Sequence, residues 1–394
     1  MKSKLIIIAN NNIGSGQSGG DTIFLEFIKN WQDKLNITVF GAEETKELLK
    51  RYQLSPNFVL TDKANKNCEP NVFNLCRHTL RRIFWAKVSF FSHLKQFKES
   101  QYCYTVSDFY PDFIFGLLYK AVNPKGVWLC GQYLFAPKPG SKYSPYEHQY
   151  LKGFFYYFLQ IFSRLLAQLF ADQILITSEP DRGRFPNKKV IVVQGGVDVT
   201  ESNKYLKLGK IKSVSKRKYD AVFQGRLHSQ KGVIELVDIW KIVVKTIPNA
   251  KLAIIGNGQL ENELKLKISR LKLNQNIILL GFQSGQNKYD VFKDSKIVVH
   301  PAIYDSGGMA AAEAMAWGLP GVSFDLEALK TYYPKGMIKS KNGDYHDFSK
   351  NIISLLHNQK LYQKTSQEAL ELIRSVWDWS KRASKLYKEI FHDK

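Results

Sequence analysis

Short runs of apolar residues alternate along the first half of the chain with longer segments in which apolar positions recur at helical spacing. The runs read KLIIIA from Lys4, ITVFG from Ile37, GVWLC from Gly126, QILITS from Gln173 and KVIVVQGG from Lys189. Runs of this kind, bounded by turn residues, indicate buried strands. Because strands that alternate with helices form βαβ units, the pattern predicts a parallel sheet covered by helices.

The same alternation begins again after a basic stretch that is poor in large apolar residues. The new runs are YDAVFQG from Tyr219, AKLAIIGNG from Ala250, NIILLGF from Asn276, KIVVHPA from Lys296 and LPGVSF from Leu319. We therefore predict an α/β protein with two Rossmann-like parallel-sheet domains facing across a cleft, with ligands beyond the carboxyl ends of the strands. The predicted parts are an N-terminal domain (1–200), a linker (201–218), a C-terminal domain (219–375) and a last helix (376–394), which could cross back to the N-terminal domain.

The composition excludes a disordered chain and a collagen-like repeat, since 44% of the 394 residues are hydrophobic and 23% are charged. The four cysteines (Cys68, Cys76, Cys103 and Cys130) are too few for a disulfide framework and match no zinc spacing. We expect reduced thiols in a cytoplasmic protein. The first apolar run is shorter than the roughly 7–15 residues of a signal-peptide core, and no window of about 18 apolar residues predicts a transmembrane helix.

The chain carries 57 Lys plus Arg against 35 Asp plus Glu, a formal net charge of +22, which predicts an anionic partner. Residues 72–98 contain no acid, several aromatic residues and the basic residues Arg77, Arg81, Arg82, Lys87, Lys95 and Lys98. Three interpretations remain open: an anionic membrane surface, a solvated face over a buried aromatic stripe and, least favoured, nucleic acid. Residues 152–170 form a second aromatic segment, and both segments are candidates for peripheral membrane contact.

A glycine-rich loop follows the first predicted strand. Gly14, Gly16 and Gly19 spell G-x-G-x-x-G, and Glu43 follows the second strand, as in a dinucleotide-binding site of an NAD(P)-dependent oxidoreductase. However, Asn10 to Ile13 lie between the strand and the first glycine, so the turn is longer than that site requires. We therefore favour Gly19 and Gly20 as backbone that approaches a phosphate.

Two loops of the second half suit a phosphate ligand. In QGRLHSQKGV, Gly225 ends a strand and the loop that follows supplies Arg226 and Lys231, a planar fork and a point charge for diphosphate oxygens. The sequence GNG places Gly256 and Gly258 after another strand, where glycines favour a tight strand-to-helix turn. We include these residues among the candidates for ligand binding.

The segment from His300 to Val322 gives the most specific indication of a ligand site. Asp305 ends the loop after a strand, and Ser306, Gly307 and Gly308 would allow close approach of the backbone to a ligand. Met309 and Ala310 begin an alanine-rich helix on which Glu313 lies one turn after Met309, on the same face. A sugar nucleotide needs this combination, because carboxylates accept bonds from its hydroxyls and the N–H groups between them suit its phosphates.

Taken in order, these motifs resemble the retaining glycosyltransferases of family four, which have the two-lobed GT-B fold. The matching segments are Gly19-Gly20, GGVD from Gly195, Gly225-Arg226 with Lys231-Gly232, IIGNG, LLGF, HPA with Asp305 and Glu313, AMAWGLPGV and the last WDWSKRASKLY stretch. The resemblance is strong from about residue 219 to 385. Asp305 and Glu313 stand at the acidic positions of the family's Glu-x7-Glu motif, here Asp-x7-Glu.

The resemblance implies a hexosyltransferase that moves a sugar from a UDP- or GDP-linked donor to a glycan or lipid-linked acceptor with retention of configuration. It would work in the cytoplasm, in peripheral contact with the membrane, in cell-surface polysaccharide or glycolipid synthesis. Arg226 and Lys231 would neutralise the leaving diphosphate, Glu313 would hold the ribose and Asp305 would bind sugar hydroxyls. Backbone at Gly308 to Ala310 would touch sugar or phosphate. No metal or other cofactor is implied, because the cations supply the positive charge.

This chain departs from the family at three positions. Asp305 replaces the usual Glu, Gly195 replaces the usual Asn of the NGVD turn, and the segment after GVWLC has no His. The acceptor side therefore has to be proposed by position alone, with Tyr104, Ser107, Asp108 and Gln132 as candidates. A non-catalytic glycosyltransferase-like subunit remains the main alternative, and the oxidoreductase suggested by Gly14 and Glu43 remains the lesser one.

Overall fold

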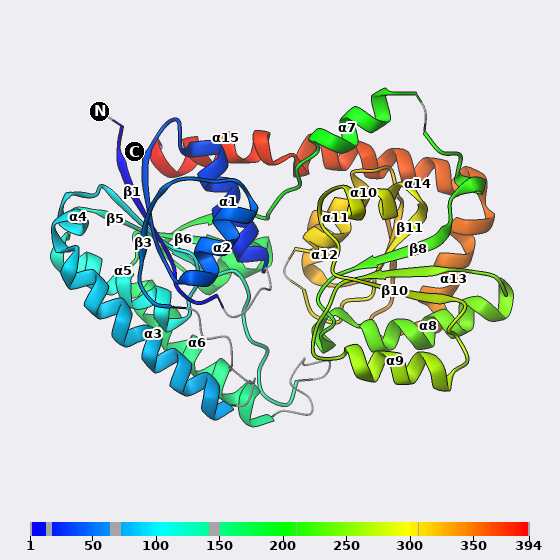
Figure 1. Ribbon diagram of the computed structural model, residues 1–394, viewed down its shortest axis with the longest axis horizontal. Coiled ribbons are helices and arrows are strands. Elements are labelled where there is room, and N and C mark those ends of the chain that lie inside the picture. Colours follow the sequence, from blue (N-terminus) through cyan, green and yellow to red (C-terminus); the bar gives the residue numbers. More distant parts are fainter. Residues whose placement is uncertain are drawn as a thin grey trace. The chain divides into compact units, whose positions relative to one another are not determined.

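The computed structural model describes residues 2–12, 18–63, 72–141, 150–209, 211–305 and 307–392. The chain divides into two compact units (Figure 1). Of the described residues, those up to Gly195 and those from Ala383 onward form the first unit, and those from Gly196 to Arg382 form the second. Each unit is built on its own parallel sheet, which confirms the predicted α/β class.

The first unit contains a seven-stranded parallel sheet with the order β3-β2-β1-β4-β5-β6-β7. The strands are β1 (Lys4–Ala9), β2 (Asn36–Gly41), β3 (Asn57–Leu60), β4 (Tyr102–Thr105), β5 (Val127–Gly131), β6 (Gln173–Ile176) and β7 (Lys189–Val192). Their alternating side chains face opposite sides of the sheet. Ile6 and Ile8 belong to one buried cluster, together with Cys103 and Cys130, whose thiols are free.

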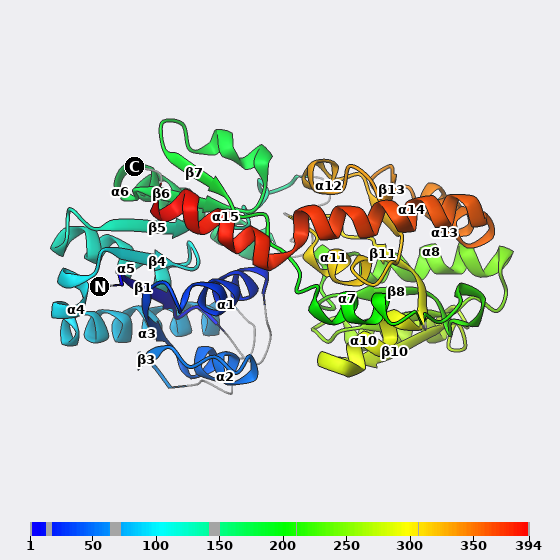
Figure 2. The same cartoon turned by 90° about the horizontal axis from the view of Figure 1, so that it is seen from above.

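Helices cover both faces of this sheet (Figures 1 and 2). On one face lie α3 (Val72–Ser92), α5 (Tyr110–Val122) and α6 (Tyr150–Phe170), with α4 (Leu94–Glu99) beside them. On the other lie α1 (Gly19–Trp31) and the last helix, α15 (Trp379–Phe391), while α2 (Glu43–Arg51) joins β2 to β3. Trp31 donates a hydrogen bond from Nε1 to the Ala383 carbonyl at 3.0 Å, and its ring packs on Phe391. These contacts fix the last helix to α1 of the first unit.

The second unit has a six-stranded parallel sheet with the order β10-β9-β8-β11-β12-β13. Its strands are β8 (Tyr219–Gln224), β9 (Leu252–Ile255), β10 (Ile277–Gly281), β11 (Ser295–His300), β12 (Gly321–Phe324) and β13 (Met337–Ser340). Its helices are α7 (Thr200–Lys207), α8 (Val233–Thr246), α9 (Glu261–Arg270), α10 (Gly285–Lys293), α11 (Met309–Met315), α12 (Glu327–Tyr332), α13 (Tyr345–His357) and α14 (Gln359–Leu372). Residues 201–218, predicted as a linker, contain most of α7 and group with this unit.

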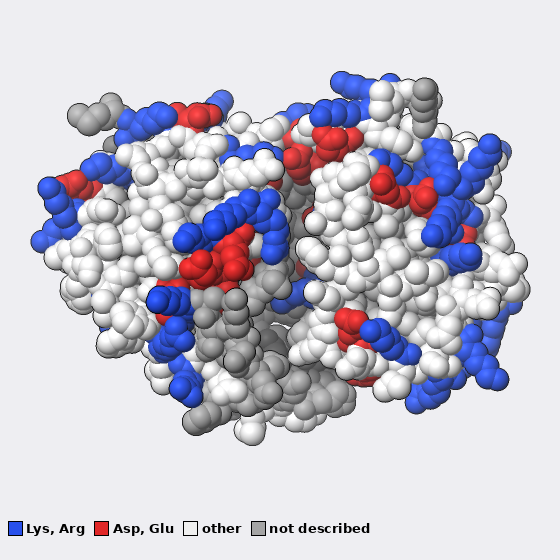
Figure 3. Space-filling model, viewed as in Figure 1, with Lys and Arg blue, Asp and Glu red and all other residues white. Residues whose placement is uncertain are grey.

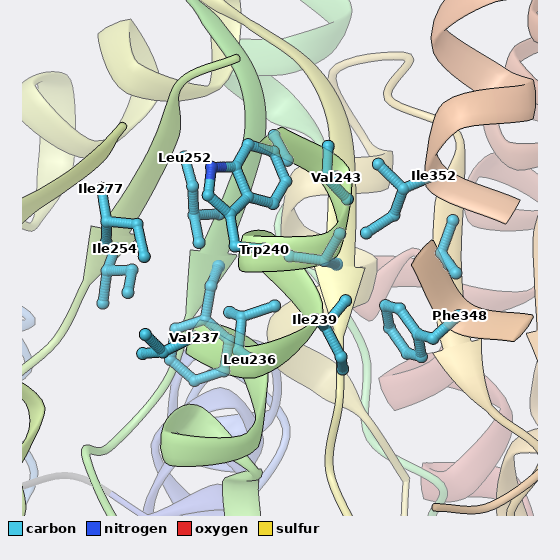
Figure 4. Packing of buried hydrophobic residues seen from close by; sticks show 14 of the residues in the cluster. Leu236, Val237, Ile239, Trp240, Val243, Leu252, Ile254, Ile277, Phe348 and Ile352 are labelled. Atoms are coloured by element: carbon cyan, nitrogen blue, oxygen red, sulfur yellow. The ribbon is translucent and has the colours of Figure 1, made fainter. Parts of the chain in front are cut away.

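The core of the second unit forms where α8 packs against the sheet and against α13, which also contacts the sheet. Trp240 on α8 is fully buried and lies beside Leu252 and Val243, with Ile352 of α13 nearby (Figure 4). Because α8 buries one face made of positions spaced three and four residues apart, it fixes the loop that precedes it. That loop carries two of the predicted site residues, Arg226 and Lys231.

Candidate functional site

The candidate site lies beyond the carboxyl ends of β8 and β11, which are neighbours in the second sheet. The loop after β8 supplies Arg226 and Lys231, and the loop after β11 supplies Asp305. The structure brings Lys231 and Asp305 together, with 2.6 Å between Nζ and Oδ2. Two segments far apart in the sequence therefore form one charged cluster at the edge where parallel sheets bind ligands.

The loop that carries Lys231 is held in place by its backbone. Gly232 has a φ of 65°, and a Cβ atom at this position would lie 1.9 Å from the Pro301 carbonyl oxygen. The Ile303 amide donates to the Gln230 carbonyl at 3.2 Å. Only glycine allows this approach of the two loops, so Gly232 fixes where the Lys231 side chain begins.

Asp305 is the most enclosed charged residue of the site, with a side chain that is 9% exposed. Its Oδ1 accepts the Gly307 and Gly308 amides at 3.2 and 3.1 Å, and its Oδ2 accepts Lys231 and lies 3.1 Å from Nε2 of buried His300. Burial by itself raises the pKa of Asp305, but the Lys231 ammonium and the His300 hydrogen bond hold this pKa well below its usual range. Asp305 is therefore a carboxylate at neutral pH.

Arg226 differs from its neighbours in the site because its side chain is exposed. Among the residues that the structure describes, no acid or carbonyl pairs with its guanidinium. Gly225 donates its amide to the Ile255 carbonyl at 3.0 Å, which anchors the start of the loop. The guanidinium is thus available for an anion without breaking an internal bond.

Gly256 and Gly258 pack against the backbone of the loop that follows β8. A Cβ at Gly256 would lie 1.8 Å from the Gly225 carbonyl oxygen, and one at Gly258 would lie 2.6 Å from that of Leu227. Both glycines also have positive φ values, 143° and 155°. These contacts explain both glycines by packing, while their predicted part in ligand binding stays a prediction.

Glu313 lies on α11 and is bound on one side only. Its Oε2 accepts Nε2 of Gln224 at 2.9 Å and Nζ of Lys288 at 2.6 Å. No described residue donates a hydrogen bond to its Oε1, and the side chain is 29% exposed. No role was predicted for Gln224, which is only the first residue of the segment QGRLHSQKGV, or for Lys288, which α10 brings in from outside the two loops.

The loop between Asp305 and α11 has the predicted helix start at Met309, with Ala310 next to it. Gly308 has a φ of 65°, and its carbonyl accepts the hydroxyl of buried Tyr333 at 2.6 Å. Gly307 is buried beside it, while Ser306 lies outside the described residues. Among the residues that the structure describes, no group of His, Cys, Asp and Glu side chains is arranged to hold a metal ion.

The glycine-rich loop of the first unit is described only from Ser18 onward, so Gly14 and Gly16 lie outside the described residues. Gly19 and Gly20 begin α1, which Ser18 and Asp21 cap reciprocally. A Cβ at Gly20 would lie 3.3 Å from the Tyr133 ring, so backbone and ring are close here. Glu43 begins α2, with its carboxylate 3.9 Å from the Lys46 ammonium.

The acceptor-side candidates lie in the first unit, at and just beyond the carboxyl ends of β4 and β5. Three of them bond to residues that sequence analysis did not identify: Tyr104 to the Tyr133 hydroxyl and Ser107 to Asp112, both at 2.5 Å, and Asp108 to Gln160 at 2.7 Å. Gln132 is buried and bonds only weakly, to Cys130 Sγ at 3.6 Å. Tyr104, Ser107 and Asp108 are thus bonded within the first unit, whereas Oε1 of Gln132 has no hydrogen-bond partner among the described residues. Their part on the acceptor side stays a prediction.

Burial changes the acidity of two carboxyl groups in this region. It raises the pKa of Asp112 to about 7 and that of Asp108 to about 6, while the hydrogen bonds from Ser107 and Gln160 oppose the shift. Asp112 also accepts the Asn10 amide at 2.5 Å, which ties the end of β1 to the start of α5. Two buried acids with raised pKa values thus lie within five residues of Ser107 in the sequence.

The basic and aromatic segment 72–98 corresponds to α3 and α4. One of its six basic residues is buried, since Arg82 is 1% exposed and bonds Glu44 at 2.7 Å. Arg81 is 39% exposed and bonds Asp62 at 2.6 Å. The other four are exposed, namely Arg77, Lys87, Lys95 and Lys98. None of the described helices is long and apolar enough to cross a membrane. On the face drawn in Figure 3, Lys and Arg side chains are spread in separate groups.

Comparison with known proteins places this site in a family. The family model of glycosyl transferases group 1 matches residues 208–372. Over 167 residues the chain is 29% identical to the poly(glycerol-phosphate) alpha-glucosyltransferase of Bacillus subtilis (strain 168), which covers 41% of this chain and 24% of that protein. Over 139 residues it is 27% identical to the Escherichia coli UDP-Gal:alpha-D-GlcNAc-diphosphoundecaprenol alpha-1,3-galactosyltransferase, which covers 34% of this chain and 35% of that protein.

The matched part thus spans about a quarter to a third of the length of these two relatives. The structure of Anabaena HepE in complex with UDP and glucose has a TM-score of 0.67 at 15% identity and covers 98% of both chains, which confirms the predicted GT-B fold. Residues 208–372, which contain the motifs from Gly225 to Glu313, therefore belong to the glycosyl transferases group 1 family.

Proposed function

We propose that this protein transfers a sugar from a nucleoside-diphosphate sugar to a glycan or lipid-linked acceptor, with retention of anomeric configuration. The observation that carries the proposal is the Lys231–Asp305 ion pair beyond the carboxyl ends of β8 and β11, with Arg226 on the loop of Lys231 and Glu313 bonded to Gln224 at the end of β8. Two cations and a carboxylate with a free oxygen match the diphosphate and the ribose of such a donor. The UDP and UDP-Gal in the names of the similar proteins make UDP the first nucleotide to test, with GDP as the second.

In the proposed reaction, the bond between C1 of the donor sugar and the diphosphate oxygen breaks, and the acceptor oxygen bonds to C1. The acceptor proton goes to an oxygen of the leaving diphosphate on the same face, so configuration is retained. Lys231 has three N–H donors and gives one to Asp305, which leaves donors for phosphate oxygens. Arg226 adds a planar fork, and both cations stabilise the negative charge that develops as the diphosphate departs.

Glu313 is proposed to hold the ribose. Gln224 and Lys288 both bond Oε2, so the carboxylate is oriented while Oε1 can accept a ribose hydroxyl. Because the two donors come from β8 and α10, the position of Glu313 depends on three elements rather than on α11 alone.

Adding UDP or GDP is expected to raise the melting temperature of the wild type. At 100 times its dissociation constant a ligand stabilises by about 2.7 kcal/mol, or about 5–11 °C for units of this size. The shift should be lost in Glu313→Ala. The control is Glu371→Ala, whose exposed carboxylate pairs with Lys335 in the same unit and which should keep the full shift. A shift with neither nucleotide in the wild type would contradict the proposal.

A lipid-linked acceptor would explain the apolar helices of the first unit. Among the described residues, 13 of the 22 exposed large hydrophobic side chains lie on α3 and α6. They form one stripe on each helix, with Leu80, Phe84, Val88 and Phe91 on α3 and Phe154, Phe158, Phe162, Leu165 and Leu169 on α6. Figure 1 draws both helices on the same side of the first sheet. We propose that these stripes contact an anionic membrane, with Arg77 and Lys87 near lipid headgroups.

Replacing Phe84, Phe158 and Phe162 together with serine is expected to weaken binding to vesicles that contain phosphatidylglycerol at least about 10-fold, because apolar area leaves the lipid. Co-sedimentation at low salt measures this binding. The matched control is Leu266→Ser, which changes a side chain that is 72% exposed on α9 of the second unit and should bind as the wild type does. Equal sedimentation of both variants, or binding to RNA in place of vesicles, would contradict the membrane proposal.

A further inference from the structure

The two acidic residues of the site differ in how many acceptor positions remain open. Glu313 has one oxygen to which no described residue donates a hydrogen bond. Asp305 has two partners on each oxygen: the Gly307 and Gly308 amides on Oδ1, and Lys231 with His300 on Oδ2. A carboxylate offers about four acceptor positions, so those of Asp305 are filled by the protein itself.

Asp305 is also closed off from a ligand by its surroundings. Its side chain is 9% exposed against 29% for Glu313, and His300 beside it is 2% exposed. A sugar hydroxyl could reach the carboxylate only by displacing one of its four donors. Displacement would leave a buried donor unsatisfied, which is unfavourable inside a protein.

The length of the aspartate side chain fits this internal role. An Asp carboxylate can accept N–H groups two and three residues further along its own backbone, as Asp305 does with Gly307 and Gly308. The same carboxylate then fixes the end of Lys231, a long side chain that is otherwise free to adopt several rotamers. Asp305 therefore connects the loop after β11 to the cation on the loop after β8.

We propose that Asp305 is a positioning residue: it holds the Lys231 ammonium and the Gly307–Gly308 backbone where the donor diphosphate binds, and it does not contact the hydroxyls of the donor sugar. This inference rests on the proposed function for the identity of the ligand. It assigns Asp305 a different role from the sugar binding that the family resemblance implies. His300 supports the same arrangement through its hydrogen bond to Oδ2.

The dissociation constants of UDP and UDP-glucose, measured by calorimetry, distinguish the two roles. If Asp305 acts through Lys231, Asp305→Asn raises the dissociation constants of UDP and UDP-glucose by the same factor, about 10-fold, because both ligands carry the diphosphate. If Asp305 binds the sugar, the variant raises the dissociation constant of UDP-glucose and leaves that of UDP unchanged, and the proposal is wrong.

A double-mutant cycle with Lys231→Met gives a second test. In the Lys231→Met background, Asp305→Asn should change UDP-glucose affinity less than about 2-fold, because the group through which it acts is gone. A further loss as large as in the wild-type background would overturn the proposal, since the two side chains would then act independently.

A third measurement needs no nucleotide and separates failure of this inference from failure of the proposed function. Reductive methylation of the free protein should modify Lys231 several-fold faster in Asp305→Asn than in the wild type, because the ion pair no longer holds the amine. An unchanged rate would overturn the positioning role, whether or not the wild type binds UDP. Absence of UDP and UDP-glucose binding with a faster methylation rate would instead contradict only the proposed function.

The matched control is Asp220→Asn. Asp220 lies at the start of β8 and pairs with Lys296 at 2.6 Å, with a side chain that is 16% exposed, so it repeats the chemistry of the Asp305–Lys231 pair at the opposite end of the sheet. This variant should keep the wild-type affinity for both ligands and the wild-type methylation rate of Lys231. A loss of affinity in Asp220→Asn equal to that in Asp305→Asn would show a general effect of removing an ion pair and overturn the proposal.

Discussion

Replacing Arg226 with alanine is expected to lower kcat for sugar transfer about 100-fold, or about 2.7 kcal/mol in the activation barrier. The reason is that Arg226 would contact the diphosphate as negative charge develops on it. The same change should leave the free energy of unfolding within about 0.5 kcal/mol, because the side chain is exposed and no described residue pairs with it. Release of UDP from UDP-glucose, followed with and without acceptor, measures the first effect, and urea unfolding measures the second.

Arg270→Ala is the matched control for this prediction. Arg270 ends α9 in the same unit, and its side chain is exposed like that of Arg226. The control should keep wild-type kcat. If Arg226→Ala released UDP as fast as Arg270→Ala, the leaving diphosphate would not depend on Arg226, and the proposed site would have to exclude it.

Trp240→Ala is expected to have the largest effect on stability and to lower the free energy of unfolding by about 3–5 kcal/mol. Trp240 is fully buried beside Leu252 of the second sheet, as Figure 4 shows, and the change opens a cavity in the hydrophobic cluster around it. Urea unfolding followed by circular dichroism should show a lower midpoint for the second unit at an unchanged slope. Hydrogen exchange of α8 should rise with it, because α8 loses its main buried contact.

Two controls make this prediction specific. Trp240→Phe keeps much of the ring volume and removes an Nε1 atom that has no hydrogen-bond partner in the described structure. It should therefore lower the free energy of unfolding much less than Trp240→Ala does. Leu266→Ala removes a side chain that is 72% exposed on α9 and should change the free energy of unfolding by less than about 0.5 kcal/mol. If Trp240→Ala and Leu266→Ala lowered the free energy of unfolding equally, the packing of α8 would not be a main source of stability in this unit.

The strands were predictable from sequence to different degrees. The apolar runs at β1, β8 and β11 form inner strands of the two sheets, and their residues are mostly buried. The hydrophobic pattern did not predict β3, β4 and β13, whose segments NFVL, YCYT and MIKS are short and mix polar with apolar residues. β3 and β13 are edge strands, which need less apolar surface, so their pattern is weak.

The sequence by itself determined the two parallel sheets and the loops that carry the candidate chemistry, because hydrophobic period, glycine positions and strand ends are local properties. Only the tertiary structure decided what the individual charges do. It enclosed Arg82 with Glu44, brought Lys288 from α10 to Glu313, and filled both oxygens of Asp305 while leaving one oxygen of Glu313 open. Burial and pairing of a charge depend on segments far apart in the chain, and no local pattern records which of them will meet.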